Sequence, residues 1–158
     1  MIPARRLLAA AIVVAACLGI SGCAGSVALE PAPDANSPEC AEVTVRLPGD
    51  LGGQARRWTD AQATGAWGDP ATILLTCGVT PPGPTTLPCE TRNGVDWIID
   101  DAEAPQYRFT TFGRVPAVEV YLDSEKVASA DVIETLSGIA DLLPTDGSAC
   151  TERPAGEG

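Results

Sequence analysis

Hydrophobic and polar positions alternate along the middle of the chain in the way that predicts β-strands. In Ala117–Leu122 the side chains of Val118, Val120 and Leu122 share one face, which indicates a strand with one buried side. The run Ala71–Val79 is apolar almost throughout and predicts a largely buried strand. The other predicted strands are Leu87–Arg92, Val95–Asp100 and Gln106–Phe112.

The pair Asn93-Gly94 predicts a two-residue hairpin turn, because both residue types accept the positive φ that such a turn needs. The hairpin joins Leu87–Arg92 to Val95–Asp100. Pro88 places the first of these strands at an edge of the sheet, since proline has no N–H to donate to a neighbour.

Two segments that flank the predicted strands have apolar residues at the spacing of a helix. Ser129–Leu142 has apolar residues close to helical spacing and stops before Pro144. Pro38–Leu47 begins with a serine that can cap a helix, and we favour a short helix there, although its apolar residues also alternate as in a strand. These elements predict an α+β domain with four or five mainly antiparallel strands and a helix near each terminus. Gly49–Trp58 is predicted to be a loop.

The N-terminus has the pattern of a secretory signal peptide over residues 1–22. Arg5 and Arg6 precede Leu7–Ile20, an apolar run of about fourteen residues that is shorter than the roughly 20 a membrane-spanning helix needs. The next residues, Ile20-Ser21-Gly22-Cys23, resemble the lipobox of bacterial lipoproteins. We therefore predict cleavage before Cys23 and lipidation of its thiol. The alternative is ordinary secretory cleavage that leaves Cys23 as an odd thiol.

The predicted cleavage and lipidation at Cys23 divide the rest of the chain into three parts. Residues 23–37 contain two prolines and small residues without apolar periodicity, and they predict a flexible tether. A single domain is expected over residues 38–150, followed by a loose tail over 151–158. Lipid at Cys23 would hold this domain at the outer face of the cell membrane.

The composition of the chain argues against several kinds of partner and catalytic site. After loss of residues 1–22 the chain has eight basic and 21 acidic residues, a net charge of −13, which argues against a nucleic-acid partner. The chain has no histidine, so Ser-His and Cys-His nucleophile pairs and the commonest zinc ligand are excluded. No phosphate loop or dinucleotide fingerprint occurs, and no cofactor is expected.

Four cysteines remain after Cys17 is removed and Cys23 is assigned to lipid, which predicts two disulfides outside the cell. Three pairings are open. We favour Cys77–Cys89, which closes a proline-rich loop, and Cys40–Cys150, which ties the start of the domain to its end.

Candidate site residues each have a plainer interpretation. The acidic cluster Asp96, Asp100, Asp101 and Glu103 has the residue types of a hard-cation site, but a solvated turn is the favoured interpretation. Trp67 and Trp97 are candidates for a binding groove, with core filling as the alternative. Arg108 and Arg114 are candidates for holding a carboxylate or phosphate, with surface ion pairing as the alternative.

Several ordered motifs resemble a known family. They are Ala66-Trp67-Gly68-Asp69-Pro70, Leu75-Thr76-Cys77-Gly78-Val79, Cys89, Gly94-Val95-Asp96-Trp97, Phe109-Thr110-Thr111-Phe112-Gly113-Arg114 and Pro116-Ala117-Val118-Glu119-Val120. Over roughly residues 38–143 the chain resembles an actinobacterial family of secreted proteins known as the domain of unknown function numbered 3515. The resemblance implies a small, often lipid-anchored domain facing the cell envelope, and it implies no activity, cofactor or catalytic residue.

The leading hypothesis is therefore a non-enzymatic lipoprotein that binds or scaffolds an envelope protein or glycan while Cys23 holds it to the membrane. The alternative is a carboxylate- or metal-dependent enzyme that acts on cell-wall glycan or peptide. A small-ligand carrier is a third hypothesis, which an apolar pocket in the structure would favour.

Overall fold

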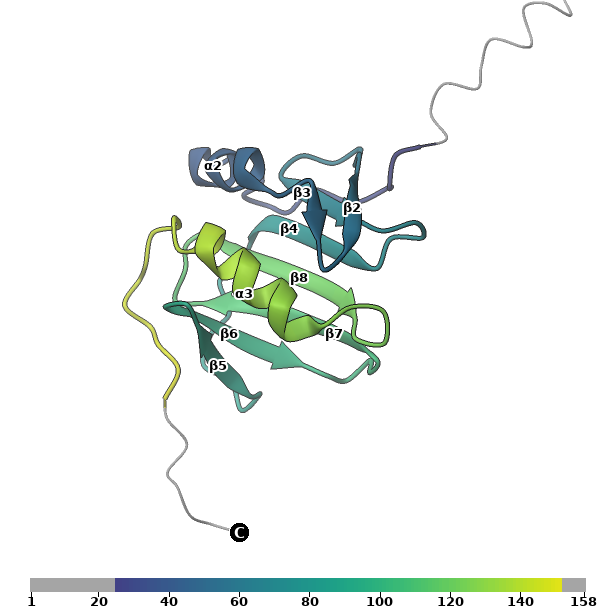
Figure 1. Cartoon of the computed structure of the whole chain (residues 1–158). Coiled ribbons are helices and arrows are strands. Elements are labelled where there is room, and N and C mark those ends of the chain that lie inside the picture. Colours follow the sequence, from purple (N-terminus) through teal and green to yellow (C-terminus); the bar gives the residue numbers. More distant parts are fainter. Residues whose placement is uncertain (1–24, 152–158) are drawn as a thin grey trace, which may run out of the picture.

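The computed structural model describes residues 25–151 and contains two helices and one antiparallel sheet (Figure 1). The predicted signal peptide, Cys23 and all but the first residue of the predicted tail lie outside the described residues. The elements in chain order are α2 (Pro38–Arg46), β1 (Asp50–Leu51), β2 (Gln54–Arg57), β3 (Thr64–Trp67), β4 (Ile73–Val79), β5 (Cys89–Arg92), β6 (Val95–Asp100), β7 (Gln106–Phe112), β8 (Ala117–Asp123) and α3 (Ser129–Ala140).

The eight strands follow the order β1-β2-β3-β4-β8-β7-β6-β5, and all neighbouring strands are antiparallel. The predicted α+β class is confirmed, but the sheet has eight strands where four or five were expected. The additional strands are β1, β2 and β3, and the predicted loop Gly49–Trp58 contains two of them.

Both helices pack against the same face of the sheet. Cys77 of β4 lies opposite Val118 of β8, and Trp97 of β6 lies opposite Thr111 of β7. At one end of this row Cys77 is bonded to Cys40 of α2, and at the other end Trp97 donates a hydrogen bond to α3. A continuous core of buried apolar side chains fills the space between helices and sheet.

The helix ends follow the sequence signals. Ser37 caps α2, its Oγ accepting a hydrogen bond from the Cys40 N–H at 3.2 Å, with Pro38 in the first turn. The predicted helix over Pro38–Leu47 is therefore confirmed, and its strand alternative is not adopted. In α3 the first turn contains Asp131, whose charge suits the positive end of the helix dipole.

The disulfides pair differently from the prediction. The structure joins Cys40 to Cys77 and Cys89 to Cys150, so the predicted bonds Cys77–Cys89 and Cys40–Cys150 are wrong. The reason is the alternation of the sheet. Cys77 faces α2, whereas Cys89 pairs in register with Ile98, which lies on the opposite face from its neighbour Trp97.

The described part of the predicted tether lies against the domain. Val27 forms a parallel bridge with Thr59, and the Asp34 N–H donates to the Gly78 carbonyl at 3.0 Å. The close approach requires glycine at position 78, because a Cβ there would lie 2.5 Å from the Ala35 nitrogen. Ala35 is buried. Packing onto the domain therefore begins before Pro38, where the sequence placed the domain's start.

Candidate functional site

Trp67 is a core residue. Its side chain is fully buried, and its Nε1 donates to the Pro48 carbonyl at 3.0 Å. That bond satisfies the polar atom of the indole and leaves the ring to fill the space beneath α2. The hypothesis that Trp67 lines a groove is wrong, and the core-filling alternative holds.

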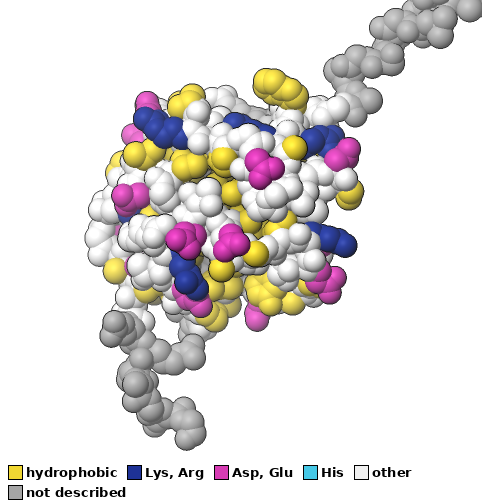
Figure 2. Space-filling view, viewed as in Figure 1, with side chains coloured by type: hydrophobic (Ala, Val, Ile, Leu, Met, Phe, Trp, Pro, Cys, Tyr) yellow, Lys and Arg dark blue, Asp and Glu magenta, His cyan; other side chains and the backbone are white. Residues whose placement is uncertain are grey.

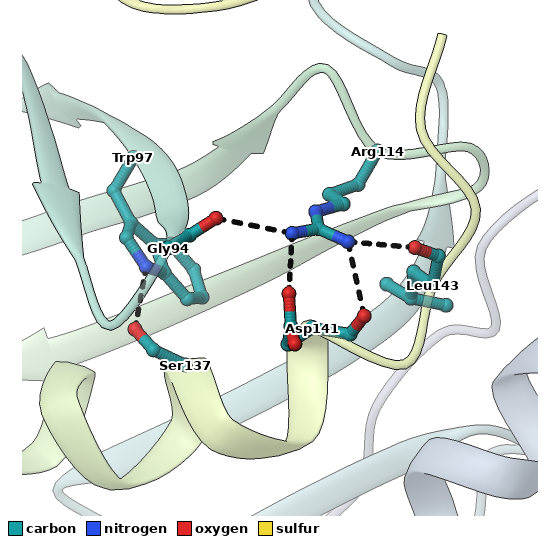
Figure 3. Close-up of polar contacts among 6 residues, drawn as sticks. All are labelled: Gly94, Trp97, Arg114, Ser137, Asp141 and Leu143. Atoms are coloured by element: carbon teal, nitrogen blue, oxygen red, sulfur yellow. Dashed lines mark hydrogen bonds and ion pairs between the residues drawn. The ribbon is translucent and has the colours of Figure 1, made fainter. Parts of the chain in front are cut away.

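Trp97 is also buried, with 1% of its surface exposed. Its Nε1 donates to Ser137 Oγ on α3 at 2.9 Å (Figure 3). That hydroxyl in turn donates to the Ile133 carbonyl at 2.7 Å. Every polar atom of this contact is therefore satisfied, which fixes α3 over β6. Trp97 nevertheless forms part of a pocket wall, which is described below.

Arg114 anchors the end of α3 and does not bind from the surface. Its guanidinium is buried and donates to the carbonyls of Asp141, Leu143 and Gly94 at 3.0, 2.8 and 3.1 Å (Figure 3). It also pairs with Asp141 Oδ1 at 2.7 Å. Carbonyls at a helix C-terminus have no hydrogen-bond donor within the helix, and Arg114 supplies that donor. The prediction that Arg114 holds a ligand anion is therefore wrong.

Arg108 lies on the other face of the sheet, apart from Arg114. It pairs with Glu119 of β8 at 2.6 Å, and its guanidinium carbon lies 5.1 Å from the centre of the Tyr121 ring. Tyr121 OH donates to Glu103 at 2.8 Å, and this hydrogen bond to a carboxylate raises the pKa of Tyr121 above 10.0. Surface ion pairing, the plainer interpretation of Arg108, is what the structure contains.

The four acidic candidates do not converge. Asp96 accepts hydrogen bonds from Thr91 Oγ1 and the Cys150 N–H, and Asp100 accepts from the Ala102 N–H in a turn. Glu103 is used by Tyr121. Among residues 25–151, no group of three or more such side chains is arranged to hold a metal ion.

The best-formed apolar pocket lies between the β5–β6–β7 end of the sheet and the first half of α3. Its floor comes from strand alternation, which turns Trp97 and Ile99 of β6 and Tyr107 and Phe109 of β7 toward the helices. Ile99 lies opposite Phe109, and the rings of Tyr107 and Phe109 stack with centres 6.3 Å apart. The pocket has a volume of about 310 Å³.

The other walls are a helix and an edge strand. Ile133, Ala130 and Ser129 of α3 close one side, and Glu90 and Arg92 of β5 stand at the rim. Arg92 and Glu90 pair with each other at 2.7 Å and are about half exposed. The pocket can therefore accommodate an apolar group, with hydrogen-bonding and charged groups at its mouth for a polar end.

Three polar ties hold α3 to the β5–β6 hairpin and so fix the shape of this pocket. They are the Trp97–Ser137 bond, a bond from Asn93 Nδ2 to the Glu134 carbonyl at 3.2 Å, and the Arg114 guanidinium, which bridges Gly94 and Asp141 at the end of the helix. Binding sites on rigid elements hold their geometry better than sites on loops.

Two further hollows lie elsewhere. One of about 300 Å³ lies over the Arg108–Glu119–Tyr121 group on the open face of the sheet. Another of about 900 Å³ surrounds the Cys89–Cys150 bond, between the proline-rich segment before β5 and the end of the described chain. Its walls are mainly loop, and it is more polar than the pocket under α3.

Sequence reasoning missed the pocket, although one signal was present. Ile99, Tyr107 and Phe109 fall on the same face as Trp97 by simple alternation, and together they make an apolar surface broader than one twelve-residue helix covers. Which part stays uncovered depends on where α3 crosses the sheet, and the chain pattern does not contain that information.

The fold and pocket define a small α+β domain with two disulfides, in which two helices cover one face of an antiparallel sheet. The chain belongs to the family of proteins of unknown function DUF3515, whose family model matches residues 3–146. Comparison with curated proteins and with solved structures gives no match. Within residues 25–151 the helices are too short or too polar to cross a membrane.

Proposed function

We propose that this protein is an extracytoplasmic lipoprotein, anchored by lipid at Cys23 to the outer face of the cell membrane, that binds an apolar group of a cell-envelope component. The observation that carries the binding role is the pocket of about 310 Å³ walled by Trp97, Ile99, Tyr107, Phe109 and Ile133. Apolar walls with a few polar groups at the mouth are typical of ligand sites.

Three observations support the proposed location at the outer face of the cell membrane. The chain begins with the basic, apolar and lipobox-like segments of a lipoprotein precursor. The family match starts at residue 3 and therefore includes those segments. The domain contains two disulfides, which form and persist in oxidising compartments outside the cytoplasm.

A pocket-filling variant tests the binding role. Ala130 is exposed and lines the pocket, so Ala130→Trp places an indole against it without disturbing the core. Thr135→Trp adds the same side chain at an exposed position of α3 that is not part of the pocket. We expect the apolar dye anilinonaphthalene sulfonate to bind wild type and Thr135→Trp saturably, and Ala130→Trp about tenfold more weakly, a loss of roughly 1.4 kcal/mol. Equal binding by all three proteins would remove the pocket from the proposal.

The natural ligand requires an experiment in intact cells. A photoreactive benzophenone side chain at position 92, on the exposed rim of the pocket, should crosslink a reproducible envelope component, and one at position 135 should not. A Cys23→Ala variant should lose that adduct because the domain is no longer held at the membrane. Adducts that are the same from both positions would argue against a specific ligand in the pocket.

A further inference from the structure

The start of the described chain is fixed to the segment that follows β2. The Val27 N–H donates to the Trp58 carbonyl at 2.7 Å, and the Asp60 N–H donates to the Val27 carbonyl at 3.3 Å. Arg57 Nη2 also donates to the Gly25 carbonyl at 3.2 Å. Figure 1 shows the described part of the chain starting near β2. Gly25 is two residues after Cys23, and two residues span at most about 7 Å. A lipid on Cys23 is therefore confined to the neighbourhood of Trp58.

Trp58 differs from the other two tryptophans. Its exposed fraction is 85%, the largest among the described large apolar side chains, whereas Trp67 and Trp97 are buried. An indole has an apolar body and a polar N–H, and tryptophan is for this reason enriched at the level of lipid headgroups.

We propose that Trp58 inserts into the headgroup region of the membrane to which Cys23 is attached, so that the β1–β2 edge of the domain rests on the bilayer. This inference rests on the proposed lipid anchor. The anchor supplies a high effective concentration, so a single side chain suffices to orient the domain although it would not recruit it from solution.

The charged residues near Trp58 indicate that the indole, and not a basic patch, makes the proposed contact with the membrane. Arg57 pairs with Asp69 at 2.8 Å, and Arg56 donates to the Leu47 carbonyl at 3.0 Å. Asp60 is exposed beside the same segment and would oppose attraction to anionic lipids. In Figure 2 acidic and basic side chains are likewise interspersed over the visible surface.

The inference sets the orientation of the pocket. β2 and β5 are separated by six interstrand steps in the sheet order. At about 4.8 Å per step, β5 lies roughly 29 Å from β2 along the sheet. Glu90 and Arg92 at the rim of the pocket would then face the envelope space.

Depth-dependent quenching tests this placement on the full, naturally lipidated protein. The protein is purified from its own membranes and reconstituted into vesicles of brominated phosphatidylcholine and phosphatidylglycerol. We expect the emission of Trp58 to shift to the blue and to be quenched, because bromine on the acyl chains quenches only nearby indoles. Trp58→Phe should abolish this loss and leave the unquenched emission of the two buried tryptophans.

A matched control moves the indole to the opposite edge. In the Trp58→Phe background, Leu87→Trp adds an exposed tryptophan just before β5, and its emission should be unquenched. Both variants should still float with vesicles, since the lipid carries attachment. Floating protein with an unquenched Trp58, or with Leu87→Trp quenched as strongly, would overturn the orientation and leave the anchor intact. Protein that carries no lipid and does not float would overturn the proposed anchor and this inference together.

Discussion

The two ends of the sheet are completed in different ways. At the β1–β4 end, α2, Trp67 and the Cys40–Cys77 bond seal the helix-facing side, and both cysteines are fully buried. At the β5–β7 end, α3 covers only part of the apolar surface, and the Cys89–Cys150 bond lies at the sheet edge, partly exposed. The closed end lies next to the proposed anchor, and the open end contains the apolar pocket that the proposed binding role requires.

Removing the two disulfides separately should give the largest losses of stability among these tests. The bonds span 37 and 61 residues, and chain entropy predicts about 4 kcal/mol for either. Loss of the inner bond also removes fully buried contacts, so Cys40→Ala/Cys77→Ala should cost about 1–2 kcal/mol more than Cys89→Ala/Cys150→Ala. Urea unfolding measures both free energies of unfolding. A greater cost for the outer bond would reverse the roles assigned to the two ends.

The tryptophans extend the comparison to single residues. Trp67→Ala should lower the free energy of unfolding by about 4 kcal/mol because it empties the space under α2. Trp58→Ala, at an exposed position, should change it by less than about 0.5 kcal/mol. Thermal and urea unfolding measure both. Similar costs for the two variants would contradict the assignment of one to the core and the other to the surface.

The arginines give a smaller contrast. Arg114→Met removes the donor from three carbonyls, of which that of Leu143 is buried, and should cost about 2 kcal/mol. Arg108→Met breaks a surface pair with Glu119 and should cost less than about 1 kcal/mol. Hydrogen exchange should show the Arg114 variant opening first where α3 meets the β5–β6 hairpin. Unchanged hydrogen exchange at this junction would mean that Arg114 does not hold α3 against the β5–β6 hairpin.

The smallest effect concerns pH on the open face. Because the Glu103 carboxylate accepts the phenolic hydrogen bond, the pKa of Tyr121 is raised above 10.0. A raised pKa in the folded state contributes stability that is full below the unfolded pKa and is lost as pH rises through the folded pKa. Glu103→Ala should move the Tyr121 titration to lower pH, measured by tyrosinate absorbance, and Tyr121→Phe identifies that component. An unmoved titration would exclude Glu103 as the cause.

Sequence patterns predicted the fold where a strong period or turn was present. Asn93-Gly94 forms the expected hairpin, with both residues at positive φ. The β1–β2 hairpin was missed although Gly52 and Gly53 also have positive φ and form its turn. The reason is that β2, Gln54–Arg57, is polar and lies near the sheet edge, so it shows no hydrophobic alternation.

Contacts between segments that are far apart along the chain could not be predicted from the sequence. Which face each cysteine takes depends on strand register, and the wrong disulfide pairing followed from not knowing it. Trp67, Trp97 and Arg114 were expected to bind a ligand, but their hydrogen-bond partners come from other elements of the fold, and only Trp97 also lines the pocket. The pocket arises from the crossing position of α3, which no local pattern encodes.

The proposed orientation of the domain and the presentation of its pocket both depend on the lipid anchor. Mass spectrometry of the N-terminal peptide, from protein extracted from its native membranes, determines whether that anchor is present. We expect a peptide that begins at Cys23 and carries diacylglycerol on its thiol. A peptide that retains residues before Cys23, or one with an unmodified Cys23, would contradict it.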